Sequence, residues 1–370
     1  MKKALLISCF NWYKARLEPV REILIEKGFD VTVLIADFDH IQKKPIEKKY
    51  EECTYVQVPP YSSNLSLQRI QSHLAFGKEV KKTLERLNPE LVYVQIPPNN
   101  AAKHCAEYKK KNQDTRLILD IIDLWPESMP LGRLKDTLPA KKWKKWRDDC
   151  TEAADHIYTE CRLFQEKLQL PKEKTSVLYL FKDQKQDESE SVKRLIQQKA
   201  EKREKEEIKF AYLGSMNNII DIKGICDIIK QYIQKGYACE LHAIGDGENK
   251  GEFEDSAENI GCDSFFYGPI YNEKEKIRIL APCDYALNMM KESVEVGLTI
   301  KSVDYMSYGL PMINSIKGDT WDMIERWGIG INVTGKETEA KEIDHEAVHQ
   351  YFQKNFSRES FEKNLRASLI

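Results

Sequence analysis

The chain has 370 residues, of which 41% are hydrophobic and 31% are charged, and its formal net charge is −2. This length is too great for one hydrophobic core and predicts two domains of ordinary size. The near-neutral charge excludes a dedicated nucleic-acid-binding protein, whose domains are usually basic, so no nucleic-acid partner is expected.

The cysteines and the apolar segments favour a cytoplasmic protein. The nine cysteines include no Cys-x-x-Cys pair, so neither a zinc site nor a disulfide framework is indicated, and reduced thiols are the simpler interpretation. The apolar run from Ala4 to Phe10 is as short as the shortest signal-peptide cores and is followed by no small-residue cleavage site. No other segment approaches the ~20 apolar residues of a membrane span.

Short apolar runs alternate with amphipathic segments of helical spacing, which is typical of βαβ units and parallel sheets. In the first half, this pattern predicts strands at 4–8, 31–35, 54–58, 91–94, 117–121 and 156–159, and helices at 18–27, 66–87 and 101–111. In the second half, it predicts strands at 210–213, 240–244, 265–267, 285–287 and 312–314, and helices at 219–235, 250–259, 273–280 and 300–308.

A charge-dense segment, 182–207, interrupts this alternation and is predicted to be a linker with an exposed helix from Ser191 onward. The expected domains are therefore residues 1–181 and 208–344, followed by a C-terminal helical segment at 345–370. The predicted fold class is α/β, with two Rossmann-like doubly wound domains facing each other across a cleft. In such sheets, ligands bind beyond the carboxyl ends of the strands.

Two features of the first half bear on cofactors. The loop 9–16, after the first predicted strand, lacks the Gly-x-Gly-x-x-Gly of a dinucleotide-binding domain, which disfavours a nicotinamide-dependent oxidoreductase. Asp37-Phe38-Asp39 resembles an Asp-x-Asp metal motif, but it follows the second strand of a Rossmann-like pattern, and the seven histidines form no metal-binding constellation. We therefore expect neither a metal nor another cofactor.

Asp123 follows the predicted strand 117–121, at the edge where catalytic groups of open sheets gather. A carboxylate there can act as a general base toward a substrate or can orient it. The alternative is a helix N-cap, because Pro126 and Glu127 can open a helix. Trp125, in the same segment, is a packing residue or a binding platform.

The segment from Lys141 to Arg147 carries a pair of tryptophans among cations. On a helix, Trp143 and Trp146 share one face, and Lys144 lies between them in the sequence. A helix of this kind can lie at the inner face of the cell membrane, with its lysines near anionic headgroups. The equal alternative is a core-facing tryptophan pair with a solvated basic flank.

Three glycine turns follow predicted strands in the second half, at 214–215, 245–247 and 268–270. Each turn alone is weak evidence, because βα turns often carry glycine for steric reasons. The ordered series is more informative, since it places three turns at one edge of the predicted sheet.

The segment 297–311 adds a helix N-terminus that suits an anionic ligand. Backbone N–H groups near Thr299 and the helix dipole can hold phosphate, and Lys301 adds a mobile positive charge for a diphosphate. Asp304, one turn further on, can accept hydrogen bonds from a diol such as a ribose. An ordinary helix that ends at a glycine is the alternative.

Together these motifs resemble those of the retaining glycosyltransferases of the GT-B fold, family 4, which includes many enzymes of bacterial capsule and O-antigen synthesis. The resemblance covers most of the chain and is strongest over 210–333. The segments that carry it are Gly214-Ser215, Lys223-Gly224, Gly245-Asp246-Gly247, Tyr267-Gly268-Pro269-Ile270, the run from Asp304 to Pro311, and Asp123-Leu124-Trp125-Pro126-Glu127.

The resemblance implies transfer of a sugar, with retention and without a metal, from a UDP or GDP sugar to a glycan acceptor in cell-surface polysaccharide synthesis. It implies an acceptor-binding first domain that includes Arg16 and Trp125, although a surface arginine is the equal interpretation of Arg16. An acceptor linked to polyprenyl diphosphate would favour membrane contact through Trp143, Trp146 and Lys144. The implied donor-binding residues are Gly214, Ser215, Lys223, Gly245, Gly247, Ile270, Thr299, Lys301 and Asp304.

The sequence departs from the family pattern at its carboxylates. The family commonly has two glutamates eight positions apart; here the second is Asp304, and the first falls on Val296. Glu295, beside it, is the candidate for binding the donor sugar, and a solvated loop carboxylate is the equal interpretation. The catalytic candidates are thus Asp123 and Glu295. Two alternatives remain: a non-catalytic nucleotide-sugar-binding scaffold protein, and a sugar-nucleotide epimerase or hydrolase on the same fold.

Overall fold

A computed structural model of the protein describes residues 1–11, 13–47, 49–129, 132, 136–202, 207–334 and 341–369. The chain divides into two compact units. Unit 1 comprises Met1–Tyr179 together with Glu362–Ile370, and unit 2 comprises Leu180–Phe361.

The centre of unit 1 is a seven-stranded parallel sheet with the strand order β5-β2-β1-β6-β7-β8-β9. This is the Rossmann order 3-2-1-4-5-6 with one more strand at the end. β6 is buried along its whole length, as expected for a central strand with both faces covered. The strands are β1 (Lys2–Ser8), β2 (Phe29–Ala36), β5 (Cys53–Val56), β6 (Leu91–Ile96), β7 (Arg116–Ile121), β8 (His156–Thr159) and β9 (Thr175–Val177), and a separate antiparallel pair joins β3 (Phe38–Asp39) to β4 (Lys44–Pro45).

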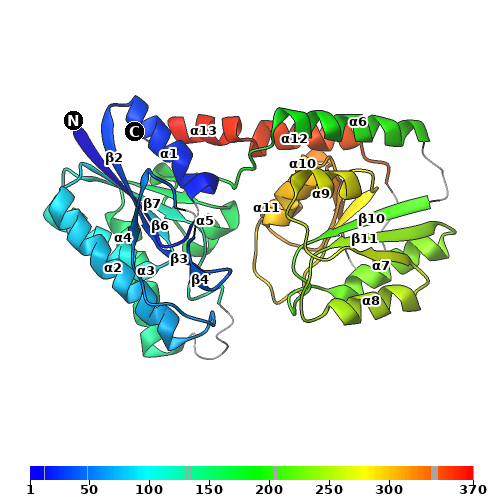
Figure 1. The fold of residues 1–370 in the computed structure, drawn as a ribbon, viewed down its shortest axis with the longest axis horizontal. Helices are drawn as coiled ribbons and strands as arrows, with labels where there is room; N and C mark the ends of the chain where they lie inside the picture. The colour runs from blue at the N-terminus through cyan, green and yellow to red at the C-terminus, as the bar shows by residue number, and fades with distance from the viewer. Residues whose placement is uncertain are drawn as a thin grey trace. The chain divides into compact units, whose positions relative to one another are not determined.

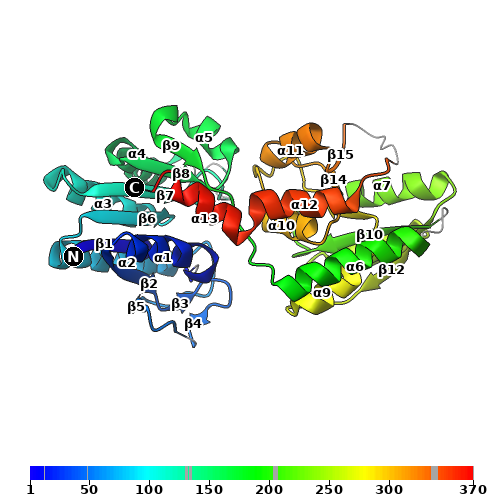
Figure 2. The same cartoon turned by 90° about the horizontal axis from the view of Figure 1, so that it is seen from above.

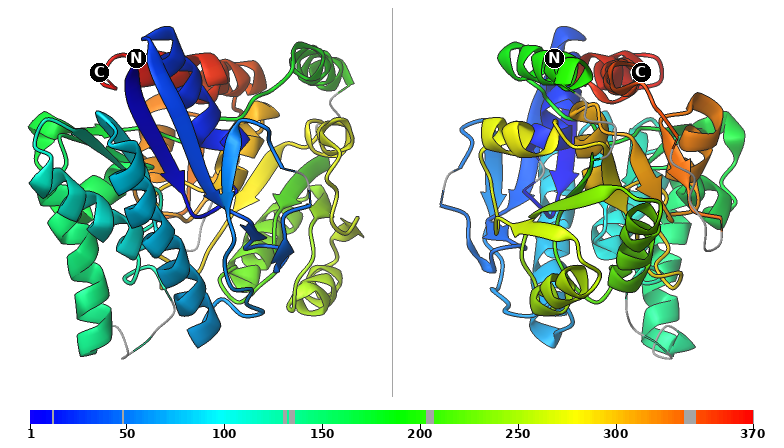
Figure 3. Two further views of the ribbon diagram at one scale, coloured as in Figure 1. Left: turned by 60° about the vertical axis from the view of Figure 1, so that its left-hand side comes forward. Right: turned by 90° about the vertical axis from the view of Figure 1, so that its right-hand side faces the viewer.

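Helices cover both faces of this sheet (Figure 1). On one face α2, α3 and α4 lie side by side, and on the other lie α1 and the end of the last helix, α13 (Figure 3). The guanidinium of Arg366 in α13 donates to Glu26 of α1, which ties the C-terminal helix to unit 1. The helices are η1 (a π-helical turn, Tyr13–Leu17), α1 (Glu18–Glu26), α2 (Leu67–Leu87), α3 (Asn99–Lys111), α4 (Leu138–Ala153), α5 (Arg162–Leu168), η3 (a 3-10 turn, Lys172–Lys174) and α13 (Arg358–Arg366).

Unit 2 repeats the plan with a six-stranded parallel sheet in the order β12-β11-β10-β13-β14-β15. In Figure 2, α12 and α6 run along one face of this unit, where α12 packs on α10 and α6 packs on α9. The elements are α6 (Gln186–Lys202), β10 (Glu207–Leu213), α7 (Ile222–Gln234), β11 (Ala238–Ile244), α8 (Lys250–Asn259), β12 (Asp263–Phe266), α9 (Glu273–Leu280), β13 (Tyr285–Asn288), α10 (Ile300–Ser307), β14 (Met312–Asn314), α11 (Asp319–Trp327), β15 (Gly330–Asn332) and α12 (His345–Phe356).

The two Rossmann-like units confirm the predicted fold class. All eleven predicted strands are present, and the predicted helices are present within a few residues of their expected ends. Short elements escape the prediction, because strands of two or three residues and helices of seven or nine residues carry little periodicity. Those elements are β3, β4, β9 and β15, together with the helices α5 and α11.

The charge-dense segment 182–207 contains the expected helix, but this helix starts before Ser191. Most of this segment is the helix α6, which begins at Gln186 and belongs to unit 2. Val192 of α6 is fully buried, so the charged surface of the helix hides an apolar stripe that packs on its own unit. Residues 203–206 lie outside the described residues. The chain crosses between the units near 180 and again near 361, so the C-terminal segment contributes to both units.

Candidate functional site

A cavity of about 390 Å³ opens at the carboxyl ends of three neighbouring strands of unit 2. Its lining comes from the loops that follow β10, β11 and β12, and it adjoins the point where the strand order reverses between β10 and β13. Ligands of open α/β sheets bind at such a point. The lining residues are Leu213, Gly214, Ser215, Ile244, Gly245, Asp246, Pro269, Ile270 and Tyr271.

Glycine is required where two of these loops touch. Gly214 and Gly245 have φ angles of +129° and +144°, which favour glycine. The Gly214 amide donates to the Ile244 carbonyl at 3.0 Å, and a Cβ added to Gly245 would lie 1.9 Å from the Gly214 carbonyl oxygen. Gly247 also lies close to the loop after β10, since a Cβ added to it would lie 2.3 Å from the Met216 carbonyl oxygen.

Gly245→Ala should lower the free energy of unfolding of unit 2 by about 1–3 kcal/mol, the usual cost of strained backbone. The matched control is Gly251→Ala in α8, where nothing lies within 4 Å of the added Cβ. Alanine in that helix should stabilise by about 0.5–1 kcal/mol. Hydrogen exchange of the β10 and β11 amides measures both effects. Equal protection in the two variants would contradict the close approach of the loops.

Lys301 lies in the first turn of α10, beside the cavity. A Cβ on Gly214 would lie 3.9 Å from Lys301 Cδ, and Lys301 Nζ is 5.3 Å from the centre of the Tyr212 ring. Burial lowers the pKa of Lys301 to about 8. Within the described part of the chain, no hydrogen bond or ion pair reaches this ammonium group. A desolvated cation without a counter-ion costs free energy, and an anionic ligand would remove that cost.

The start of α10 is formed by Thr299. Its side chain accepts a hydrogen bond from the Ser302 amide at 3.2 Å and contacts the Ser302 hydroxyl at 2.6 Å. This N-cap fixes where the helix begins, and therefore where Lys301 emerges from it. Thr299 thus has a structural role in addition to the predicted donor contact, which stays a prediction.

Asp304, the predicted ribose ligand, forms an ion pair within unit 2. Its Oδ1 lies 2.7 Å from Lys182 Nζ, and Lys182 also pairs with Glu273 and donates to the Tyr308 hydroxyl at 3.0 Å. Burial alone would raise the pKa of Glu273, but Lys182, together with hydrogen bonds from Lys276 and Tyr308, lowers it to about 2. Asp304 is therefore tied to the segment that begins unit 2.

Two further predicted residues, Lys223 and Glu295, lie outside the cavity lining, as do Gly247, Thr299, Lys301 and Asp304. Lys223 is exposed in the first turn of α7, whose N-cap Asp221 accepts from the Gly224 amide at 2.9 Å. Glu295 is exposed in the loop before α10, which agrees with the interpretation as a solvated loop carboxylate. Gly214, Ser215, Gly245 and Ile270 do line the cavity. The contacts predicted for all of these residues stay predictions.

In unit 1, the carboxylate of Asp123 is occupied by its own turn. Oδ1 accepts from the Leu124 amide at 2.7 Å and from the Ser128 hydroxyl at 2.5 Å, and Oδ2 accepts from Trp125 Nε1 at 2.6 Å. This agrees with the capping alternative, although the capped segment is a turn and not a helix. The role of Asp123 as a general base stays a prediction. In that role, the carboxylate would have to release these hydrogen bonds.

The alternative of a surface arginine at Arg16 is wrong, because its side chain is buried, and acceptor binding by Arg16 stays a prediction. It forms two hydrogen bonds of 2.6 Å with Asp120 and a third, of 2.9 Å, with the Leu178 carbonyl. Burial works to lower the pKa of Arg16, but the Asp120 carboxylate outweighs it and raises the pKa. Tyr93 and Gln95 complete the shell around Asp120.

The segment with the tryptophan pair packs against the rest of unit 1. Trp125 is buried and lies 5.9 Å from Trp143, ring centre to ring centre, while Lys103 Nζ lies 5.3 Å from the Trp146 ring. Both tryptophans of α4 are half-buried, which agrees with the core-facing alternative. Membrane contact through this helix stays a prediction.

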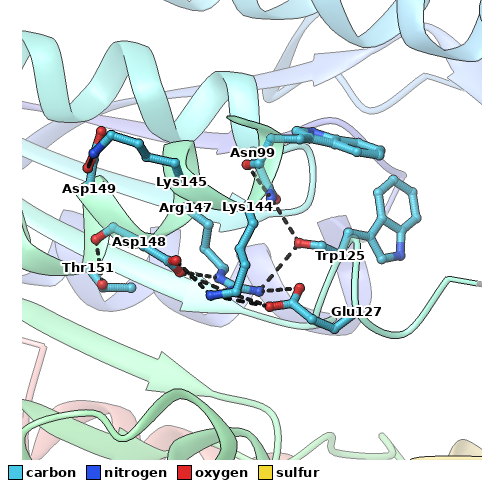
Figure 4. A network of polar contacts seen from close by, with 10 residues as sticks. Asn99, Trp125, Glu127, Lys144, Lys145, Arg147, Asp148, Asp149 and Thr151 are labelled. Carbon is cyan, nitrogen blue, oxygen red and sulfur yellow. Dashed lines mark hydrogen bonds and ion pairs between the residues drawn. The ribbon is translucent and has the colours of Figure 1, made fainter. Parts of the chain in front are cut away.

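Figure 4 shows what holds the segment around Trp125 onto α4. Arg147 is fully buried and donates two hydrogen bonds, of 2.9 and 2.8 Å, to Glu127, and its neighbour Lys144 reaches Glu127 at 3.6 Å. Asn99 of α3 donates to the Trp125 carbonyl at 2.9 Å. Within the Trp-Pro-Glu segment, Glu127 therefore acts as a structural anchor.

Glu160, which sequence reasoning missed, directly follows β8, at the same edge of the sheet as Asp123. Its amide donates to the Ile121 carbonyl at 2.9 Å, and burial raises the pKa of its carboxyl to about 8, with Arg16 opposing the rise. Only the expected position of a strand end could have indicated it.

The described residues include no group of three or more histidine, cysteine or acidic side chains arranged to hold a metal ion. None of the helices described has the length and apolar character needed to cross a bilayer.

Residues 207–343 match the family model described as "Glycosyl transferases group 1". This region contains all of the cavity lining and Lys301. No curated protein matches the sequence.

Solved structures resemble the whole chain. A lipopolysaccharide outer core galactosyltransferase, WaaB, in its apo form, is 15% identical with a TM-score of 0.67, covering 100% of this chain and 99% of its own. An E. coli structure described as trehalose-6-phosphate bound with UDP-2-fluoro glucose is 10% identical with a TM-score of 0.65, covering 100% and 99%. UDP-GlcNAc 2-epimerase from Methanocaldococcus jannaschii is 10% identical with a TM-score of 0.51, covering 100% and 99%.

At these identities the likeness establishes the fold. The chain therefore has the GT-B fold of two Rossmann-like domains, and its residues 207–343 match group 1 of the glycosyl transferases.

Proposed function

We propose that the protein is a glycosyltransferase that moves a sugar from a nucleotide-sugar donor to a glycan acceptor. The observation that carries this proposal is the ammonium group of Lys301, which lacks a partner among the described residues and lies beside a cavity walled by glycine turns. The match of residues 207–343 to the glycosyl transferases group 1 model supports it.

In this function, unit 2 binds the donor and its cavity holds the diphosphate. Cleaving the bond between the anomeric carbon and the phosphate builds negative charge on the leaving diphosphate and positive charge on the sugar ring. Lys301 and the positive end of α10 would stabilise the leaving group, because a preorganised cation in a partly desolvated site costs little reorganisation during the reaction. We propose that no metal is needed for this step, and that Asp304 contacts the ribose after exchanging part of its pairing with Lys182.

The finer assignments rest on the resemblance to family 4. We propose a UDP or GDP sugar as donor, retention of configuration, and an acceptor in cell-surface polysaccharide synthesis that is bound by unit 1. The galactosyltransferase and the UDP-2-fluoro glucose complex among the similar structures support a hexose donor. We also propose that the protein works in the cytoplasm, peripheral to the inner face of the membrane, where an acceptor linked to polyprenyl diphosphate would be found.

A second candidate is a sugar-nucleotide epimerase, which the likeness to the UDP-GlcNAc 2-epimerase favours. Among the described residues that line the cavity, Asp246 is the only acid, and Glu295 lies outside that lining. An epimerase would consume the donor with no acceptor present, whereas a non-catalytic scaffold protein would bind the nucleotide and release nothing.

Nucleoside diphosphate release tests the proposal. UDP-, GDP- and dTDP-sugars are first screened by thermal shift, where a ligand at 100 times its dissociation constant should stabilise by about 2.7 kcal/mol. The sugar that binds is then incubated with and without lipid-linked glycan acceptors. We expect nucleoside diphosphate release only with an acceptor, and much less from Lys301→Met. Donor isomerisation without acceptor would favour the epimerase, and tight binding without any release would favour the scaffold protein.

A further inference from the structure

A second set of cations gathers at the carboxyl edge of the unit 1 sheet. Lys43 and Arg69 come from the β3–β4 hairpin and from α2, two elements that are distant in the sequence. They share their surroundings with two histidines and three aromatic rings. We call this set the Arg69 cluster; it comprises Lys43, Arg69, His40, His73, Phe10, Tyr61 and Trp125.

Arg69 is a buried cation that forms no ion pair with an acidic side chain among the described residues. Arg69 is only 7% exposed. Its Cζ lies 4.3 Å from the centre of the Trp125 ring and 5.6 Å from the centre of the Tyr61 ring. Nη1 donates to the Asn64 carbonyl at 3.1 Å, and Nε is buried without a hydrogen-bond partner. Burial lowers the pKa of Arg69, and nearby groups such as Tyr61 only partly oppose this. Aromatic rings attract the guanidinium but do not neutralise its charge.

Lys43 holds a second positive charge on the open side of the cluster. Its backbone has a φ angle of +57°, a conformation uncommon for a non-glycine residue. The ammonium group lies 5.1 Å from the centre of the Tyr61 ring and donates to the His40 carbonyl and the Asn64 side-chain oxygen, both neutral acceptors. Burial and then Arg69 lower the pKa of Lys43, while Asp39 opposes them.

The remaining titratable groups do not balance these charges. Burial lowers the pKa of His40 to about 4 and that of His73 to about 3, and Arg69 adds to both shifts, so both imidazoles are neutral near pH 7. Asp39 accepts from the amides of Ile41 and Gln42 and caps its own turn. Asp123 likewise serves its own turn, and neither acid forms an ion pair with the two cations within the described ranges.

We propose that the Arg69 cluster binds an oxyanion, a phosphate or carboxylate group, of the sugar-containing molecule that unit 1 recognises. Among the described residues, the two cations meet only neutral acceptors and aromatic rings. They attract an anion more strongly than exposed lysines do, because water screens them less. Lys43 and His40 are only half-buried and give the anion its access. The inference rests on the proposed function to the extent that this molecule is the glycosyl acceptor.

Direct binding to the full-length protein tests this inference without any transfer reaction. The Lys301→Met background is used throughout, so that the cavity of unit 2 does not compete for phosphate. Ligand-observed NMR titrations compare glucose 1-phosphate, glucuronate and neutral glucose. We expect at least one anionic probe to bind more tightly than glucose. Lys43→Met should weaken that binding about tenfold or more, the usual effect of losing a hydrogen bond from a charged group.

Lys44→Met is the matched control, because Lys44 is exposed beside Glu47 at 2.9 Å and should leave the affinity unchanged. Arg69→Met should weaken anion binding as Lys43→Met does, provided that the Arg69→Met variant folds. If it does not fold, the affinity of Lys43→Met alone tests the inference. Preference for glucose 1-phosphate identifies a phosphate-bearing ligand, and preference for glucuronate identifies a uronic acid. Equal affinity for glucose and both anions, or affinity unchanged by Lys43→Met, would overturn the inference. A protein that binds the anion but releases no nucleoside diphosphate would fail only the proposed function.

Discussion

Lys301→Met should weaken the affinity for a nucleoside diphosphate about 10- to 100-fold, because a hydrogen bond to a charged group contributes about 1.5–3 kcal/mol. The same substitution should leave the melting temperature of the ligand-free protein unchanged or raise it. The reason is that the wild-type protein desolvates this ammonium group without a partner within the described residues, which lowers its pKa to about 8. Calorimetric titration with UDP and GDP and thermal denaturation measure the two effects.

Lys230→Met is the control for that experiment, since Lys230 is exposed on α7, away from the cavity lining. Its affinity should equal that of the wild type. Lys223→Met tests the sequence-based prediction that Lys223 binds the donor, because in the structure Lys223 is also exposed and lies outside the cavity lining. An affinity loss at Lys223 as large as that at Lys301 would show that the diphosphate extends to α7. Unchanged affinity in Lys301→Met would remove the basis for the site.

Arg16→Met should lower the free energy of unfolding of unit 1 by about 3–5 kcal/mol, the cost of leaving one member of a buried ion pair alone. The orphaned group would be Asp120, which is fully buried and keeps only its bonds from Tyr93 and Gln95. Hydrogen exchange of the β1 and β7 amides reports on this unit separately from unit 2. The expected result is a loss of protection across both strands.

Lys14→Met provides the comparison for Arg16. Lys14 lies in the same turn, η1, and its exposed ammonium group pairs with Glu18, which is buried. Because water screens the ammonium group, we expect this pair to contribute about 1 kcal/mol or less. We expect Lys14→Met to leave hydrogen exchange nearly unchanged. If Arg16→Met also left it unchanged, the buried ion pair would not be a stabilising element of unit 1. Selective loss of acceptor binding in such a stable variant would restore the role that the sequence predicts for Arg16.

The sheet architecture and the cavity walls are predictable because they depend on local patterns. Parallel strands alternate with amphipathic helices, and their carboxyl ends meet at one edge, so glycine turns after 213, 244 and 267 must come together. Gly214 and Gly245 are needed there for positive φ and close backbone contact, which is why glycine is informative at these positions.

The errors and omissions come from long-range contacts. In the sequence, Arg16 has the character of a polar loop residue. Its partner Asp120 is 104 positions away, so no local spacing indicates the pair. The same holds for Arg147, whose charge suggests a basic surface but which is buried against Glu127. Charged runs also mislead: α6 looks like a solvated linker, yet one buried stripe that includes Val192 fixes it to unit 2.

Lys43 and Arg69 show a different limit. The two-residue strands of the β3–β4 hairpin have no periodicity to detect, and a lysine or an arginine in isolation indicates only a solvated charge. Whether these two cations attract an anion depends on the neutral acceptors and rings around them, which come from loops after several strands. Such a cluster becomes visible only when the fold brings these loops together.

The central claim, that the strand-end loops of unit 2 hold a nucleoside diphosphate, is tested most directly by the structure of the protein crystallised with UDP or GDP. The claim predicts a diphosphate oxygen at hydrogen-bond distance, about 3 Å, from Lys301 Nζ, with the diphosphate against the backbone of Gly214 and Gly245. A nucleotide bound elsewhere in a complex in which Lys301 still has no anionic partner would contradict it.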